Sequence, residues 1–219
     1  PRSHPENGGS VLLRAENVTI LTNGSINAYA TGFRGGYGPG CSGAWSSGGG
    51  YGGKGGPQNA GGLEGPTYGS SNAPVDPGSA GHSQNNSTTA RAGGVIRIAA
   101  TGTVRIEGTL TAGGGDAPPY NGGGAGGSIF VTCRKFIGAP TGALRANGGT
   151  VQNVTYWGCG GGGGRIAVWR TRDVNGQGVI TAVAAGGAGS NGSVPAYSGA
   201  DGTVVWGRIP ESGMIFLVR

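Results

Sequence analysis

The sequence predicts an all-β protein, a parallel β-solenoid in which short strands stack on one another and glycine-rich loops form the corners. Gly accounts for 54 of the 219 residues, about a quarter of the chain against a usual share of about 7%. Charged residues make up only 11% of the chain, which argues against long helices. A glycine pair followed by alternating apolar residues recurs at Gly8, Gly93, Gly126 and Gly163, and a shorter copy begins at Asp201. Such a strand repeat cannot bury its apolar face alone and must stack on its neighbours.

The first predicted strand of each repeat follows the glycines directly. Apolar residues occupy every second position, which places them on one face of an extended chain. We expect these side chains to form the core. They are Val11/Leu13, Ile96/Ile98, Ile129/Val131, Ile166/Val168 and Val204/Trp206.

Two further short strands are predicted in each repeat. The second strands include residues 18–20 and 104–106, with Phe136-Ile137 as a looser match. In the closing strands a large inward residue is followed two positions later by Ala, which suits a narrow interior. These inward pairs are Ile26/Ala28, Leu110/Ala112, Leu144/Ala146 and Ile180/Ala182. The outward positions between them are polar, namely Asn27, Thr111, Arg145 and Thr181.

A single domain is predicted over residues 1–219, with a glycine-rich insertion at about residues 32–92 after the first repeat. Residues 48–56 of the insertion carry Gly-Gly-X triplets, and prolines punctuate residues 66–77. A structureless loop of this length is unusual inside a compact domain. Three interpretations stay open for it: polyglycine-II-like packing, irregular but docked loops, and disorder.

The later glycine-rich inserts leave the predicted solenoid at one corner, so they are expected to form one surface. Tyr and Trp rings on such a surface can stack on sugar rings, and neighbouring glycines let a ligand approach the backbone. The alternative is that the rings seal gaps between glycine-rich segments. The candidate glycan-binding residues are Tyr120, Tyr156, Trp157 and Tyr197.

The cysteines and the apolar C-terminal run give two further predictions. Cys133 falls at an inward strand position and is expected to be a buried free thiol, whereas Cys41 and Cys159 lie in glycine-rich loops and either pair as a disulfide or stay free. An unpaired strand edge needs a cap or a partner, so the apolar run predicts self-association into a homo-oligomer or filament. Its residues are Met214, Ile215, Phe216, Leu217 and Val218.

The sequence shows little catalytic chemistry, and no catalytic residue, cofactor or metal is predicted. The glycine run at residues 158–164 is followed by a strand rather than by the Lys-Ser/Thr and helix of a phosphate-binding loop. The 9 acidic residues are isolated, which disfavours a polysaccharide lyase or hydrolase. The 15 basic residues give a net charge of +6 but are scattered, so nucleic acid is not an expected partner. No apolar run is long enough to predict a membrane span.

The repeated cassette consists of Gly-Gly-Ser-Ile-Phe-Val at residues 126–131, the segment 142–149, and residues 160–168. It resembles the glycine-rich parallel β-helix repeats of very large secreted or surface-exposed proteins, and it is similar to polyglycine-II-containing phage fibre adhesins. The resemblance implies an extracellular or cell-surface location and a structural or adhesive role, with no catalytic residues to carry over. The expected function is a non-enzymatic structural subunit of an extracellular filament, matrix or surface fibre. A glycan-binding adhesin is the alternative, ahead of a polysaccharide lyase.

Overall fold

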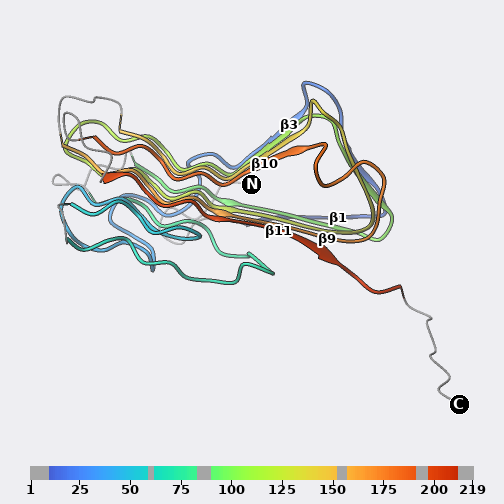
Figure 1. The fold of residues 1–219 in the computed structure, drawn as a ribbon, viewed down its shortest axis with the longest axis horizontal. Coiled ribbons are helices and arrows are strands. Elements are labelled where there is room, and N and C mark those ends of the chain that lie inside the picture. The colour runs from blue at the N-terminus through green and yellow to red at the C-terminus, as the bar shows by residue number, and fades with distance from the viewer. Residues whose placement is uncertain (1–9, 59–61, 83–89, 152–156, 191–196, 212–219) are drawn as a thin grey trace, which may run out of the picture.

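The computed structural model describes residues 10–58, 62–82, 90–151, 157–190 and 197–211. Their secondary structure consists of short strands joined by extended glycine-rich segments (Figure 1). The strands are β1 (Ser10–Ala15), β2 (Val18–Ile20), β3 (Ser25–Asn27), β4 (Val95–Ala100), β5 (Thr103–Ile106), β6 (Thr109–Thr111), β7 (Ser128–Gly138), β8 (Ala143–Arg145), β9 (Arg165–Asp173), β10 (Thr181–Val183) and β11 (Thr203–Arg208).

The strands form two sheets, and all paired strands within each sheet are parallel. The larger sheet has 7 strands, in which β1-β4-β7-β5-β2 follow one another and β9 lies between β7 and β11. The smaller sheet has 4 strands in the order β10-β8-β6-β3. Each parallel pair joins strands from successive sequence repeats, so the repeat sets the order of the sheets.

The predicted parallel β-solenoid with glycine-rich corner loops is wrong. The first and second predicted strands of the later repeats are not separate walls, because β7 and β9 run through both and join them into one seven-stranded sheet. The polar residues Arg134 and Lys135 stay inside β7, whereas Thr101-Gly102 interrupts the chain between β4 and β5. The glycine-rich segments also do more than connect strands at the corners. They pack together beside the sheets and form what we call the glycine-rich body (Figure 1).

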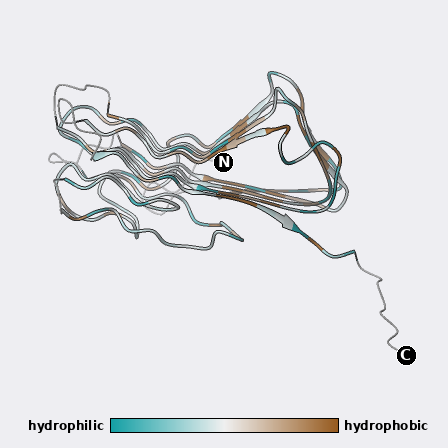
Figure 2. Ribbon diagram, viewed as in Figure 1, coloured by the Kyte–Doolittle hydropathy of each residue, from teal (hydrophilic) through white to brown (hydrophobic). Residues whose placement is uncertain are grey.

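The predicted alignment of the first strands is confirmed residue by residue. Leu13 pairs with Ile98, Ile98 with Val131, Val131 with Val168, and Val168 with Trp206. In the inner strands these side chains are almost fully buried, and they form the core together with Phe136 and residues of the smaller sheet. Figure 2 shows the hydrophobic residues concentrated along the strands, while the glycine-rich segments are pale.

The last closing strand is offset by two residues from its predicted alignment. Ala182, not Ile180, pairs with Leu144, so Val183 rather than Thr181 continues the outward row of Arg145. Ile180 is still buried, because it packs against the backbone turn beside Gly138 and Gly142 instead of entering the strand. The pattern of a large residue followed two positions later by Ala is met by Ile180/Ala182 and not by the observed inward residues Ala182 and Ala184, which is why the sequence predicts the wrong alignment here.

The glycine-rich body is held by hydrogen bonds between backbones. Gly161 N–H donates to Gly149 O at 2.9 Å, Gly149 N–H donates to Gly124 O at 2.8 Å, and Gly187 N–H donates to Gly161 O at 2.8 Å. A Cβ atom on Gly161 would lie 2.1 Å from Gly124 O, so the segments approach more closely than any side chain allows. This network satisfies backbone polar groups that lie outside the sheets.

The described parts of the insertion are docked onto the rest of the molecule. Gly49 bridges two later segments, since its N–H donates to Gly123 O at 3.0 Å and its carbonyl accepts from Gly162 N–H at 2.8 Å. Tyr51 is fully buried, and its hydroxyl lies 2.7 Å from Ser128 Oγ on β7. Disorder is therefore the wrong interpretation for these parts of the insertion.

Candidate functional site

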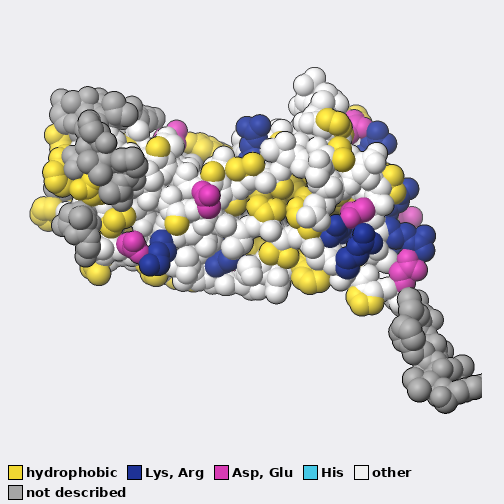
Figure 3. All heavy atoms as spheres, in the orientation of Figure 1, with side chains coloured by type: hydrophobic (Ala, Val, Ile, Leu, Met, Phe, Trp, Pro, Cys, Tyr) yellow, Lys and Arg dark blue, Asp and Glu magenta, His cyan; other side chains and the backbone are white. Residues whose placement is uncertain are grey.

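An aromatic pocket of about 250 Å³ lies in the glycine-rich body, and it gathers three of the four predicted glycan-binding residues. Tyr120, Trp157 and Tyr197 come from three different inserts and all line it. The ring centroids of Trp157 and Tyr197 are 6.1 Å apart with a tilt of 40°. Figure 3 shows apolar side chains at the left end of the molecule, where Figure 1 places glycine-rich segments. The remaining lining residues are Ser46, Gln58, Gly158, Cys159 and Ser190.

Backbone hydrogen bonds fix the wall of the aromatic pocket. Tyr120 N–H donates to Trp157 O at 2.6 Å, which ties two of the inserts together. Gly158 and Ser190 form an antiparallel bridge, with N–H to O distances of 2.9 and 2.8 Å. Tyr197 O accepts from Gly160 N–H at 2.9 Å. The pocket is thus formed by the same glycine-permitted packing as the body around it.

The predicted glycan-binding and self-association residues differ in exposure and in whether the structure describes them. Trp157 and Tyr120 are half exposed, at 51% and 49%, whereas Tyr197 is only 9% exposed. Tyr156 lies outside the described residues, as does the predicted self-association segment at residues 214–218. Ser190 and Gln58 are lining residues that sequence reasoning missed, since nothing in their local sequence marks them.

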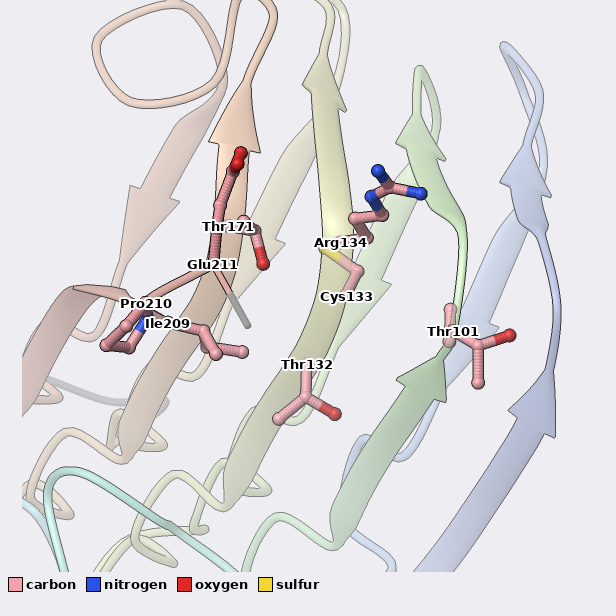
Figure 4. Close-up of a pocket in the computed structure, with 9 residues that line it drawn as sticks. Thr101, Thr132, Cys133, Arg134, Thr171, Ile209, Pro210 and Glu211 are labelled. Carbon is pink, nitrogen blue, oxygen red and sulfur yellow. The ribbon is translucent and has the colours of Figure 1, made fainter. Parts of the chain in front are cut away.

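A second hollow, of about 460 Å³, lies beside the larger sheet near the end of β11 (Figure 4). Burial raises the pKa of the Cys133 thiol, one of its lining groups, to about 12. The thiol is therefore protonated at neutral pH and is not an activated nucleophile. The other residues around the hollow are Ala100, Thr101, Thr132, Arg134, Thr171, Ile209, Pro210 and Glu211.

All three cysteines are free. Cys133 is buried, as predicted, and its thiol faces the core side of β7. Cys41 and Cys159 do not form a disulfide, since the Cys159 thiol donates instead to Pro57 O at 3.0 Å. Burial raises the pKa of the Cys159 thiol to about 12, so the aromatic pocket contains a neutral thiol.

Charged side chains gather mainly over the strands on the face shown in Figure 3. Arg170 is only 3% exposed and donates through Nε to Asp173 Oδ1 at 2.8 Å. The hydrogen bonds from Arg170 hold the pKa of Asp173 below its usual range, and the charges of Arg170 and Arg208 act in the same direction. A carboxyl group with a lowered pKa is a poor general acid. Within the described residues, no group of three or more His, Cys, Asp and Glu side chains could hold a metal ion.

The Arg170–Asp173 pair predicts a loss of stability in acid. Because the folded-state pKa of Asp173 is lowered, its contribution is complete above the unfolded-state pKa and is lost as the pH falls through the folded-state value. Asp173→Asn is expected to lower the free energy of unfolding at pH 7 by about 2–4 kcal/mol, since it leaves a buried guanidinium without a carboxylate. The variant should also lose less stability between pH 7 and pH 3, as measured by urea unfolding. Glu211→Gln is the control, because its ion pair with Arg172 is exposed to solvent and should contribute much less than the buried pair. Equal pH dependence in the wild type and Asp173→Asn would contradict this assignment.

Both ends of the strand stack are open among the described residues. β1 pairs only with β4, and β11 pairs only with β9. Leu13 is 36% exposed, whereas its partner Ile98 in the next strand is 1% exposed. At the opposite end Val204 is 39% exposed and its partner Ile166 is 0% exposed. Within the described ranges, the outermost apolar residues of the ladder therefore have no further strand beside them.

The described residues include no helix that is long and apolar enough to cross a membrane. No protein-family model matches this chain, and neither the curated proteins nor the solved structures contain a match.

Proposed function

We propose that this protein is a non-enzymatic structural subunit of an extracellular filament, matrix or surface fibre, and that it assembles end to end. The observation that carries the proposal is the pair of open ends, where strand edges that no other described strand pairs with coincide with partly exposed apolar side chains. An exposed parallel edge is a template for another strand, because its backbone N–H and C=O groups have no partner on that side.

The two open ends match each other in register. The intermediate pairings relate Val11 to Val204 and Leu13 to Trp206 through the buried rows of the inner strands. A second copy could therefore place its β1 beside β11 and continue both the hydrogen-bond ladder and the apolar rows. This contact joins two different surfaces of the protein, so it cannot form a symmetric dimer. Repetition of the same contact produces an open fibre unless the rotation from copy to copy closes a ring.

The arrangement of reactive side chains supports a role other than catalysis. Glu107, Asp173 and Glu211 are each engaged by an arginine, and the pKa of each carboxyl group is lowered by that hydrogen bond. Burial keeps Cys133 and Cys159 protonated. The described structure outside the strands is instead rich in glycine whose backbone packs in close contact, as expected of a structural protein.

Substitution at the first open end tests the proposal. Leu13→Lys is expected to raise the concentration needed for assembly by at least about tenfold, because a charge would replace an apolar side chain in the buried contact. Fibres are counted by negative-stain electron microscopy, and the assembled mass is measured by sedimentation. Leu13 is already 36% exposed in the single chain, so the fold should tolerate the change.

Leu63→Lys is the matched control, since Leu63 is 67% exposed and lies in the insertion rather than at an open end. It should assemble as the wild type does. A wild-type protein that stays monomeric at all accessible concentrations, or Leu13→Lys fibres indistinguishable from those of the control, would overturn end-to-end assembly. Labelling of intact cells with an impermeant reagent tests the extracellular location separately.

A further inference from the structure

We propose that the aromatic pocket binds one ring of an uncharged polysaccharide or glycan chain. This activity goes beyond assembly and uses none of the residues at the open ends. The pocket is lined by Tyr120, Trp157, Tyr197, Ser46, Ser190 and Gln58, beside Gly158 and Cys159. Its rings, its polar groups, its charge and its size each restrict the class of ligand.

The aromatic rings provide a stacking surface. Trp157 is half exposed, and the centre of its ring lies 6.1 Å from that of the largely buried Tyr197 ring. A pyranose ring presents a face of C–H groups, and such a face packs on the π surface of Trp and Tyr. Tyr120 adds a second half-exposed ring on the adjoining insert.

One buried polar atom in the wall lacks a hydrogen-bond partner within the described part of the chain. Ser190 is 6% exposed, and its Oγ makes no hydrogen bond among the residues that the structure describes. Its backbone is fixed by the bridge to Gly158, so only rotation about χ1 can reposition the hydroxyl. An orphaned buried hydroxyl is costly, and a ligand hydroxyl would satisfy it. The amide of Gln58, another lining residue, supplies a further donor and acceptor.

The lining carries no ionised side chain, which excludes strong recognition of an acidic sugar. The thiol of Cys159 is neutral because burial raises its pKa to about 12. Carboxylate or sulfate groups on a glycan would need Arg or Lys partners, and none lines the pocket. An aliphatic ligand would in turn leave the Ser190 hydroxyl unsatisfied. A ring with one apolar face and several hydroxyls fits both constraints.

The size and stiffness of the pocket match a single ring. Its volume of about 250 Å³ is below the range of about 300–1,000 Å³ that is typical of drug-sized ligands. Tyr120 holds a positive φ of 64°, a conformation that is uncommon for residues other than glycine and is often found at functional sites. Its carbonyl accepts a hydrogen bond from Ser46 Oγ, so the strained residue is held in place on two sides.

Binding is tested with a panel of purified hexasaccharides, the neutral cello-, manno- and xylohexaose and the anionic oligogalacturonate, by isothermal titration calorimetry and tryptophan fluorescence. The expected result is saturable binding of at least one neutral hexasaccharide that does not weaken with added salt. Trp157→Ala should weaken this binding by about tenfold or more through the loss of ring stacking.

Ser190→Ala separates ligand binding from structural support. It should weaken binding about three- to tenfold while leaving the thermal midpoint unchanged or higher, because it removes a hydroxyl that is unsatisfied in the free protein. Ser79→Ala is the matched control. Ser79 is also buried, but its Oγ accepts from Gly40 N–H at 2.8 Å and donates to the Tyr68 hydroxyl, so its loss should lower the midpoint and spare binding.

Three outcomes would overturn the proposal. They are the absence of saturable binding to every neutral hexasaccharide, binding of oligogalacturonate alone with loss at high salt, and unchanged affinity in both Trp157→Ala and Ser190→Ala. Failure of fibre formation by the wild type would leave this result untouched, because the test uses the monomer in dilute solution.

Discussion

Replacement of Gly161 by Ala is expected to destabilise the protein by at least about 3 kcal/mol, more than a buried glycine substitution usually does. The added Cβ would lie 2.1 Å from the Gly124 carbonyl oxygen and 2.5 Å from its carbon, and both atoms belong to backbone that cannot rotate away. Alanine also restricts the unfolded chain, which favours folding by about 0.4–1 kcal/mol. This opposing effect is too small to offset the clash. Urea unfolding measures the difference, and the soluble fraction on expression reports a variant that fails to fold.

Gly113→Ala provides the control in the same body. Its added Cβ would lie 3.2 Å from Cδ2 of Tyr29, the outer part of a side chain that is 45% exposed and can move. This variant should stay within about 1 kcal/mol of the wild type. If Gly161→Ala proved as stable as Gly113→Ala, the close backbone packing described for the glycine-rich body would be incorrect.

Removal of the Arg165 side chain is expected to release the insertion from the sheets. Arg165 is 7% exposed, and its guanidinium donates to Tyr68 O at 2.8 Å and to Tyr51 O at 3.3 Å. The same group lies 5.3 Å from the centre of the Tyr51 ring. Arg165→Ala should cost about 3 kcal/mol through these charge-assisted contacts. Arg165→Lys should recover little, because an ammonium group cannot reproduce the planar set of donors.

Limited proteolysis distinguishes release of the insertion from general unfolding. New cleavage sites should appear first within residues 32–92 in Arg165→Ala, at temperatures where circular dichroism still shows intact sheets. Arg105→Ala is the control, since this side chain is 50% exposed in its ion pair with Glu107 and should change stability little. Identical cleavage patterns in the two variants would show that Arg165 does not hold the insertion.

The register of the first strand in each repeat could be predicted from the sequence, because an alternation of apolar residues with period two specifies which residues share a face. The rows through Ile98 and Val131 are where the alternation placed them. By contrast, alternation could not predict that the first and second predicted strands of a repeat join into one continuous strand, as they do in β7. Cys133-Arg134-Lys135 has the composition of a polar turn, yet it continues β7, because Arg134 and Lys135 N–H both donate to Gly102 O on the neighbouring segment.

The candidate site could be predicted only in part. Tyr120, Trp157 and Tyr197 were identifiable as aromatic residues among glycines, which implied display on one surface. Ser190 carried no such signal, because a missing hydrogen-bond partner is a property of the folded surroundings and not of the local sequence. Tertiary packing likewise turned Tyr197 inward while leaving Trp157 half exposed.

The pairing of β1 with β4 across the long insertion has a consequence for the order of folding. The chain between Ser10 and Val95 is more than twice as long as that between Val95 and Ser128, which closes the next pair. Each doubling of the length of a flexible loop adds only about 0.6 kcal/mol to the free-energy cost of closing it, so the folding equilibrium is barely affected. The rate is more sensitive, since long-range pairs form slowly. We therefore expect the nucleus to arise among β4, β7 and β9, with β1 joining last and fraying first.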